Sequence, residues 1–327
     1  MTVEAQDAGQ LPDWPELNEA QRGRWTAVLN TLVDTLVALV PAGEVSVVIE
    51  GAAAAPFAYR LADALHRVGR ACVPPTARGG DLTVYLNNRH VREDNGGARR
   101  ERGRADVVID LSDSGWPVIR RMAARLPTPA GWYIAECQAF FGGRAATWDS
   151  KFGDDMPVYA AAVAQAAPAR GSTVLDLGCG TGRALPALRE AVGPEGIVIA
   201  ADLTPEMLEA ARTAGRAEHS ALVLADAQRL PFADARIDTI FAAGLINHLY
   251  DLHGGLRELA RVTRPGGQLV VFHPTGRAAL AARHGHTLRP DEPLSERKLP
   301  RHLAETGWRQ THYDDAPNRF LAIASRE

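Results

Sequence analysis

Three glycines at alternate positions, Gly178, Gly180 and Gly182, follow directly on the apolar residues 174–177 in the segment TVLDLGCGTGR. The apolar run predicts a buried strand, and the leucines and valine that come after the glycines at helical spacing predict a helix. Glycine is needed in such a tight turn when bare backbone must approach a ligand, because side chains would block that approach. The segment therefore predicts a site for a flat, nucleotide-like ligand.

A carboxylate stands at the end of the next predicted strand. Residues 197–201 are followed by Asp202. This acid lies about twenty residues beyond the loop, where a carboxylate accepts hydrogen bonds from both ribose hydroxyls in nucleotide-binding folds. The dinucleotide fingerprint G-x-G-x-x-G would need its third glycine at Arg183. The spacing thus disfavours a nicotinamide oxidoreductase, which stays an alternative that tight NAD binding would revive.

Strands and helices alternate from residue 173 onward, which is typical of an α/β domain. Besides the two strands named above, strands are expected at residues 221–224, 239–242, 307–313 and 319–325. Ligands of parallel sheets bind beyond the carboxyl ends of the strands. The residues that directly follow these strands are therefore the candidates for binding and chemistry.

Four segments, VLDLGCGTG, ADLTPEML, ADAQRLPF and RVTRPGGQLVVF, occur in this order between residues 147 and 327. Together they resemble the class I S-adenosylmethionine-dependent methyltransferases, in the branch that includes the ubiquinone-biosynthesis C-methyltransferases and many small-molecule methyltransferases. The resemblance implies a Rossmann-like α/β fold with a mostly parallel seven-stranded sheet and an antiparallel edge strand. It also implies S-adenosyl-L-methionine as the cofactor and a small-molecule acceptor.

The resemblance further implies a role for each residue that matches the cofactor-binding motifs. These are Asp176, Gly178, Gly180 and Gly182 along methionine and ribose, Asp202 on the ribose hydroxyls, Leu203 beside adenine, Asp226 accepting from the adenine amino group, Ala227 donating its backbone amide, and Ala243 and Leu245 beside the sulfonium. The alternative for each acid is a cap on the helix that follows it.

The sulfonium methyl is already an activated electrophile, so the protein needs chiefly to align a nucleophile and exclude water. A general base helps only when the acceptor must lose a proton. His248 comes after the fourth strand, residues 239–242, and His273 comes after the fifth strand, directly behind the segment RVTRPGGQLVVF. Both are candidate bases, because an unperturbed imidazole titrates near neutral pH. For His248 a packing role is an equal alternative.

Polar side chains gather after the fourth and fifth strands, where the acceptor is expected to bind. They are Asn247, His248, Tyr250, Asp251 and His253, and then His273, Arg277, Arg283, His284 and His286. Arg277 and Arg283 either hold an anionic acceptor or are solvated. No two of these histidines have the same-face helical spacing of a recognised metal site, so no metal is expected.

An aromatic segment precedes the first strand of this half. Trp148, Phe152 and Tyr159 either form a lid that stacks on the sulfonium and excludes water, or pack in the core. Between these two roles the sequence does not decide.

The N-terminal half is also predicted to be α/β, with a helix at residues 25–40. Strands are expected at 45–50, 82–86 and 107–111, and a second helix at 57–69. An exposed loop is expected at 87–104, where a nucleic-acid patch is the weaker alternative. We place the domain boundary so that residues 1–142 and 143–327 form separate domains.

The segment that begins at Gly51 partly fits the phosphate-binding pattern G-x-x-x-x-G-K-[ST], but Pro56, Phe57 and Ala58 stand at its last three positions. With ADVVIDLSDSGWPVIRRM it resembles a shortened uridine-kinase-type nucleoside kinase. Phosphoryl transfer is not expected, because the lysine and the hydroxyl that binds magnesium are missing. The domain is interpreted as a degenerate kinase-like unit that contributes packing, dimer contacts or a wall of the acceptor site.

Charge and composition exclude several classes of protein. With 36 basic and 39 acidic side chains among 327 residues the net charge is −3, so no nucleic-acid partner and no membrane surface are expected. The apolar stretch 25–40 is too short and too interrupted to span a bilayer. Three widely spaced cysteines fit a reducing cytoplasm rather than a disulfide framework.

The sequence therefore favours a cytoplasmic methyltransferase that acts on a small molecule, with a homodimer as an open question. The main alternative is a scaffold or sensor that binds the cofactor without transferring a methyl group. A nucleic-acid methyltransferase is disfavoured by the near-neutral charge.

Overall fold

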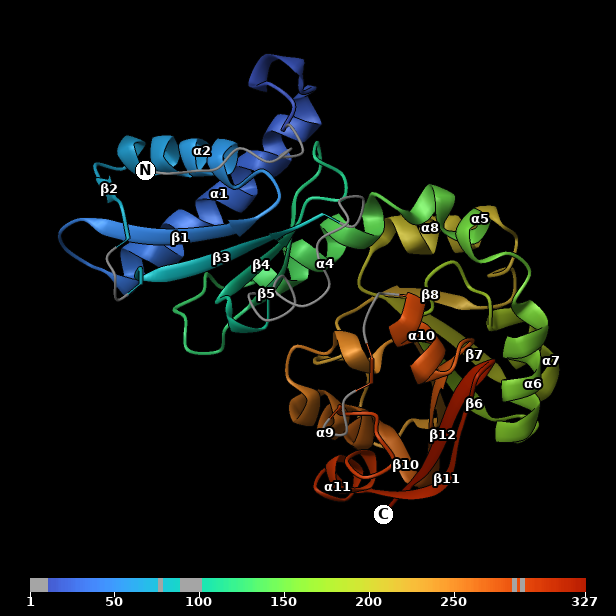
Figure 1. Cartoon of the computed structure of the whole chain (residues 1–327). Coiled ribbons are helices and arrows are strands. Elements are labelled where there is room, and N and C mark those ends of the chain that lie inside the picture. Colours follow the sequence, from blue (N-terminus) through green and yellow to red (C-terminus); the bar gives the residue numbers. More distant parts are fainter. Residues whose placement is uncertain (1–10, 76–78, 89–101, 284–286, 289–291) are drawn as a thin grey trace. The chain divides into compact units, whose positions relative to one another are not determined.

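The computed structural model describes residues 11–75, 79–88, 102–283, 287–288 and 292–327, and it divides into two compact units, Met1–Glu136 and Cys137–Glu327 (Figure 1). The division falls within helix α4 (Trp132–Gly142). Most of the loop expected at residues 87–104 lies outside the described residues.

The first unit is built on a five-stranded sheet whose neighbours follow the order β2-β1-β3-β4-β5. The strands are β1 (Val45–Gly51), β2 (Cys72–Val73), β3 (Leu82–Asn87), β4 (Val107–Asp110) and β5 (Val118–Met122). All neighbours are parallel except β5, which is antiparallel to β4. The predicted α/β class is confirmed for this unit.

Two helices, α1 (Glu19–Leu39) and α2 (Ala54–Arg67), share the core of this unit with apolar residues of the strands. The first begins at a capping box, in which the Asn18 side chain accepts a hydrogen bond from the Gln21 backbone N–H at 2.9 Å. Trp25 and Phe57, one from each helix, are fully buried and meet with their ring centroids 5.9 Å apart. A short 3₁₀ helix, η1 (Trp14–Glu16), precedes them.

Gly51, the first residue of the kinase-like segment, has a local structural reason to be glycine. Its φ is +91°, and a Cβ atom there would lie 2.2 Å from the backbone oxygen of Leu86. Phe57 stands where a phosphate-binding lysine would be required, and its side chain belongs to the core. Neither residue needs a phosphate to explain it.

The second unit contains a seven-stranded sheet in the order β11-β12-β10-β9-β6-β7-β8. The strands are β6 (Thr173–Leu177), β7 (Ile197–Asp202), β8 (Ala221–Leu224), β9 (Ile237–Ala243), β10 (Thr263–His273), β11 (Trp308–Ala316) and β12 (Arg319–Arg326). The five strands from β6 to β10 are parallel to one another. This is the mostly parallel seven-stranded sheet that the resemblance implies.

The expectation of an antiparallel strand at the edge is wrong. The antiparallel strand is β12, and it lies one place in from the edge, between β10 and β11. The reason is burial: Phe320, Leu321 and Ala322 of β12 are all buried, whereas β11 has mostly half-buried and exposed side chains. The more apolar strand of the hairpin takes the interior position, as expected for a strand covered on both faces.

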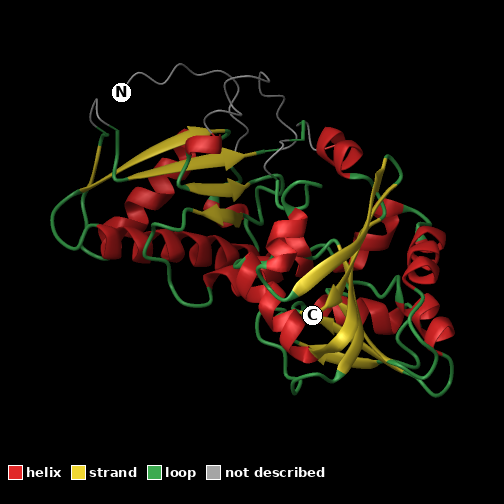
Figure 2. Ribbon diagram, turned by 90° about the horizontal axis from the view of Figure 1, so that it is seen from below, coloured by secondary structure: helices red, strands yellow, loops and turns green. Residues whose placement is uncertain are grey.

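Helices cover both faces of this sheet (Figures 1 and 2). Leu175 and Leu177 of β6 pack on the side of α9 and α11, whereas Val174, which precedes Leu175, packs on the side of α6 and α7. The helices are η2 (Ala145–Thr147), α5 (Trp148–Phe152), α6 (Met156–Ala166), α7 (Leu185–Val192), α8 (Pro205–Thr213), η3 (Ile246–His248), α9 (Leu252–Val262), α10 (Arg277–Arg283) and α11 (Leu299–Ala304).

Because the five parallel strands run in one direction, the loops that follow them meet at one edge of the sheet. Among the described residues, no helix has the length and apolar character needed to cross a membrane.

Candidate functional site

The glycine loop after β6 is tied to the end of β7. The backbone N–H of Gly178 donates to the Ala201 oxygen at 2.8 Å, and that of Gly180 donates to Asp202 Oδ2 at 2.9 Å. A Cβ on Gly182 would lie 2.9 Å from a methyl carbon of Leu185, so this glycine serves packing. A Cβ on Gly180 would meet no atom within 4 Å, so this glycine leaves open space in front of the loop.

Asp202 is held in a fixed orientation by backbone donors. Its Oδ1 accepts from the Thr204 N–H at 2.8 Å, while its Oδ2 accepts from Gly180. Burial raises the pKa of Asp202, and these backbone hydrogen bonds oppose that rise. Each carboxylate oxygen still has acceptor capacity, which is what two vicinal hydroxyl donors require.

Asp176, the penultimate residue of β6, is a buried carboxyl group without a hydrogen-bond partner. Its side chain is 1% exposed, and neither of its oxygens finds a partner among the residues that the structure describes. Burial, together with the nearby charge of Asp202, raises the pKa of Asp176 to about 8. Burying a polar group without a partner costs folding free energy, and such a group is typical of a ligand-binding site.

The loops after β7 and β8 bring further predicted residues to the same edge. Asp202 lies opposite Leu224 in the register of these two parallel strands, and the Ala225 N–H donates to the backbone oxygen of Asp202 at 2.9 Å.

The loop after β8 places Asp226 in a tight turn, in which its Oδ1 accepts from the Gln228 N–H at 2.9 Å. The backbone oxygen of Leu203 accepts from Gln138 Nε2 at 2.9 Å. Ala227 is buried at the start of this turn.

The loop after β9 approaches the glycine loop from the other side. A Cβ on Gly178 would lie 3.1 Å from Leu245 Cδ1, and a Cβ on Gly244 would lie 3.8 Å from His273 Cδ2. Ala243 ends β9 immediately before Gly244. The structure thus brings Leu245 against the glycine loop and His273 against the loop after β9.

The environment of the His273 imidazole favours its neutral form. Burial lowers its pKa, although the hydrogen bond to the Thr275 backbone oxygen acts in the opposite direction. Its Nδ1 lies 3.0 Å from the Thr275 backbone nitrogen and 2.9 Å from the Thr275 oxygen. A neutral imidazole is the form in which a histidine accepts a proton.

His248 lies on η3 and belongs to an aromatic cluster. Its ring contacts Phe141 edge-on at 5.2 Å, and Phe141 contacts Trp148 at 5.7 Å. Tyr159, by contrast, packs edge-on against Phe272 in the core of the unit. The side chain of Phe152 lies outside the described residues.

A network of charges that the sequence analysis missed ties the helix of Trp148 to the glycine loop. Asp149 Oδ1 accepts from Thr181 Oγ1 at 2.6 Å, and the same carboxylate pairs with Arg183 at 3.1 Å and Arg216 at 2.6 Å. Arg183, which is 6% exposed on its side chain, also pairs with Asp155 at 2.5 Å. Desolvation alone would raise the pKa of Asp149, but the hydrogen bonds from Thr181 and Arg216 outweigh it and the pKa is lowered.

The residues nominated for the acceptor do not form one group. Arg277 is neither solvated nor free for an anion, because its guanidinium, 12% exposed, lies 3.0 Å from the Tyr313 hydroxyl, 3.2 Å from Asp315 and 3.4 Å from Glu292. Asp251 caps α9. Arg283, Asn247 and Tyr250 are exposed, and His284 and His286 lie outside the described residues.

Residues 175–271 match the family model described as a methyltransferase domain. They lie within the second unit and contain the glycine loop, Asp202, Asp226 and the loop after β9. Residues 175–271 are therefore similar to methyltransferase domains. S-adenosylmethionine is the cofactor that this similarity indicates, and the unpartnered Asp176 and the open space at Gly180 fit a ligand that brings its own hydrogen-bond donors.

Similar proteins include a ubiquinone/menaquinone biosynthesis C-methyltransferase from Hahella chejuensis, which is 37% identical over 106 residues that cover 31% of this chain and 43% of that protein. A demethylmenaquinone methyltransferase from Corynebacterium urealyticum is 39% identical over 103 residues, covering 32% of this chain and 42% of that protein. The chain thus spans less than half the length of these curated relatives. A crystal structure of a SAM-dependent methyltransferase from Aquifex aeolicus aligns with a TM-score of 0.45 and 23% identity over 57% of this chain and 98% of that one.

Proposed function

We propose that the protein transfers the methyl group of S-adenosylmethionine to a small-molecule acceptor by in-line displacement. The observation that carries this proposal is Asp176, a buried and unpartnered carboxyl group beside a glycine loop that is open at Gly180. A buried carboxylate needs a donor or a cation to compensate it. The ammonium group of the methionine moiety supplies both.

The other cofactor contacts follow from the strand ends. Asp202 accepts from the ribose hydroxyls, because its two oxygens are already oriented by Gly180 and Thr204. Asp226 accepts from the adenine amino group, with the Ala227 backbone amide and the Leu203 side chain beside the ring. Ala243 and Leu245 lie next to the sulfonium, and Gly178 and Gly182 shape the turn.

When bound, S-adenosylmethionine supplies an electrophilic methyl group on its sulfonium. The residues of the chain then align the acceptor and exclude water. His273 removes the acceptor proton where one must be lost, because its buried ring is neutral near pH 7. His248 is the second candidate base, and its contact with Phe141 also supports the packing role.

The cofactor site is tested by calorimetric titration with S-adenosylmethionine and S-adenosylhomocysteine. We expect micromolar binding by the intact protein and at least a tenfold loss in Asp202→Ala, since both ribose hydroxyls lose their acceptor. Glu218→Ala, which changes an exposed acid of the same unit, serves as the control and should bind normally. Normal binding by Asp202→Ala would contradict the assignment.

Methyl transfer itself is tested by measuring S-adenosylhomocysteine formation against a panel of small molecules with hydroxyl, amine, thiol or activated carbon groups. Turnover that is lost in His273→Ala but retained in His248→Ala would identify the base. Tight cofactor binding without turnover on any acceptor would favour the scaffold or sensor function instead.

A further inference from the structure

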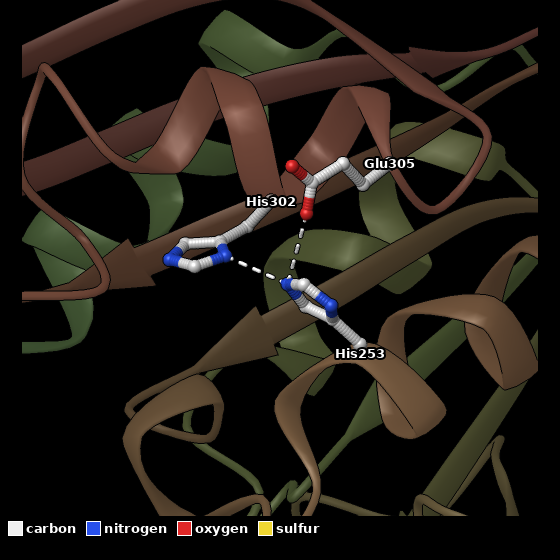
Figure 3. A group of neighbouring side chains, drawn as sticks. All are labelled: His253, His302 and Glu305. Atoms are coloured by element: carbon white, nitrogen blue, oxygen red, sulfur yellow. Dashed lines mark hydrogen bonds and ion pairs between the residues drawn. The ribbon is translucent and has the colours of Figure 1, made fainter.

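Two histidines and a glutamate from different parts of the chain converge in the second unit (Figure 3). His253 lies at the start of α9, His302 lies within α11, and Glu305 directly follows α11. Figure 3 shows the Nε2 atom of His253 turned toward both the His302 ring and the Glu305 carboxylate. Forty-nine residues separate the two histidines in the sequence, so only the fold brings them together.

The donor atoms of these three side chains lie close enough to share one ion. His253 Nε2 is 2.7 Å from His302 Nδ1 and 3.5 Å from Glu305 Oε2, and all three donor atoms lie within 4.8 Å of one another. Zinc holds imidazole nitrogens at about 2.0–2.1 Å in a tetrahedron, which sets them about 3.3 Å apart. The two rings need to separate by only about 0.6 Å to reach that spacing.

The backbone on both sides of this cluster is fixed by hydrogen bonds. The Asp251 side chain caps α9 by accepting from the Gly254 N–H at 2.9 Å, and the Trp308 indole N–H donates to the Leu256 oxygen at 3.0 Å. On the other side, the Thr306 hydroxyl donates to the His302 oxygen at 2.6 Å. The start of α9 and the end of α11 are therefore each fixed independently of any ion, and Trp308, at the start of β11, connects the chain that follows α11 to α9.

We propose that His253, His302 and Glu305 form a site for a divalent transition metal ion, with zinc as the best match. Two imidazoles and one carboxylate are a ligand set that zinc uses, whereas magnesium and calcium prefer oxygen ligands alone. Three protein ligands leave the fourth position of the tetrahedron open to water. The His253 side chain is 35% exposed and that of Glu305 is 61% exposed, so an ion from solution reaches them.

This site goes beyond the proposed methyl transfer, since none of its three ligands belongs to the cofactor-binding motifs. A bound ion would clamp the start of α9 to α11 across 49 residues of chain. The start of α9 follows the loop that carries His248, so the ion would limit the motion of that loop. Burial lowers the pKa of His302, the neighbouring His253 acts in the same direction, and Glu305 opposes both.

The site is tested on the full chain, purified without a histidine tag and stripped of metal. Zinc is titrated in competition with a chelating dye, and we expect one tightly bound equivalent per chain. His253→Ala and His302→Ala should each weaken binding at least tenfold, and Glu305→Gln should weaken it less. His219→Ala, which removes an exposed histidine of the same unit, should bind as the unmodified protein does.

Cobalt(II) gives a second readout that does not depend on enzymatic activity. We expect the visible absorption of a four-coordinate cobalt ion, and we expect it to vanish in His302→Ala. Equal zinc affinity in the unmodified protein and in His302→Ala would overturn the site. If the alanine variants fail to fold, the test rests on Glu305→Gln, which changes an exposed side chain. A zinc affinity and a cobalt spectrum equal to those of the unmodified protein would then also overturn the site. Glu305→Gln should bind S-adenosylmethionine normally whether or not it binds zinc.

Discussion

Asp176 is the residue whose environment is most unusual for its type. Its carboxyl group is buried without a partner, and burial together with Asp202 raises its pKa to about 8. An acid of this kind favours the neutral form in the folded, empty protein. A ligand that carries a cation to it must therefore displace a proton at neutral pH.

Cofactor affinity should depend on pH. Below about pH 8 the carboxyl group of Asp176 must lose its proton before it can pair with the ammonium group, so affinity should rise by up to tenfold per pH unit as pH approaches 8. Calorimetry in buffers of different ionisation enthalpy should detect the released proton. In Asp176→Asn the binding should be weak and the proton release absent.

The same group affects stability with the opposite trend. Between about pH 4 and about pH 8 the folded protein keeps the Asp176 proton while the unfolded chain has lost it, so the unfolding free energy falls as pH rises through this window. We expect the melting temperature of Asp176→Asn to exceed that of the unmodified protein by an amount that grows from pH 5 to pH 8. A constant difference would show that Asp176 has an ordinary pKa.

Two glycines of one loop should respond differently to alanine. Gly180→Ala strains a residue with φ +53° by about 1 kcal/mol and places a methyl group in the open space, so cofactor affinity should fall at least tenfold with little loss of stability. Gly182→Ala would place its methyl carbon 2.9 Å from Leu185 Cδ1 and should cost about 2–3 kcal/mol of unfolding free energy. Urea unfolding and calorimetry separate the two effects.

At the scale of elements, helix α5 is held to the glycine loop by charges rather than by apolar packing alone. Asp149 joins it to Thr181, Arg183 and Arg216. Because the pKa of Asp149 is lowered in the folded state, its stabilisation is present above the unfolded pKa of about 4 and is lost as pH falls through the folded value.

Asp149→Asn should therefore lower the unfolding free energy at pH 7 by about 1 kcal/mol, a modest value because the Asp149 side chain is 39% exposed. The difference from the unmodified protein should shrink below pH 4. Asp154→Asn changes an exposed neighbouring acid and is the matched control. An equal effect of both substitutions would argue against the network.

Local features of the chain were predictable from the sequence, whereas long-range pairings were not. The strand that leads into the glycine loop and the position of Asp202 depend on spacing over a few tens of residues, and both agree with the structure. The pairing of Asp149 with Arg183 and the meeting of His253 with His302 join residues far apart in sequence. No periodicity encodes such contacts, and for Arg183 only its departure from the dinucleotide fingerprint hinted at a separate role.

The same limit explains the misplaced antiparallel strand. Hydrophobic alternation predicted two late strands, and both exist as β11 and β12. Their order in the sheet depends on which one buries more apolar surface against β10, and that comparison requires the neighbouring helices. For Arg277, likewise, the sequence showed the charge but not the carboxylates of Asp315 and Glu292 that neutralise it.

At the scale of the whole molecule, the chain consists of two compact units, and the residues that we propose to bind the cofactor all belong to the second. A fragment that begins at Trp132, so that α4 stays whole, should bind S-adenosylmethionine within about threefold of the full chain's affinity, because the hydrogen bonds that orient Asp202 lie within it. A cooperative thermal transition first shows that the fragment is folded, and calorimetry then measures its affinity for S-adenosylmethionine. A folded fragment that does not bind would show that the first unit completes the site.

The interior position of β12 bears on how the chain is synthesised. A ribosome makes β11 before β12, yet β11 has no neighbour in the sheet until β12 has paired with β10. A nascent chain that has reached only residue 318 therefore leaves the β12-facing edge of β10 and the whole of β11 unpaired, and such edges invite association with other chains. Pairing of β12 with both β10 and β11 removes these edges.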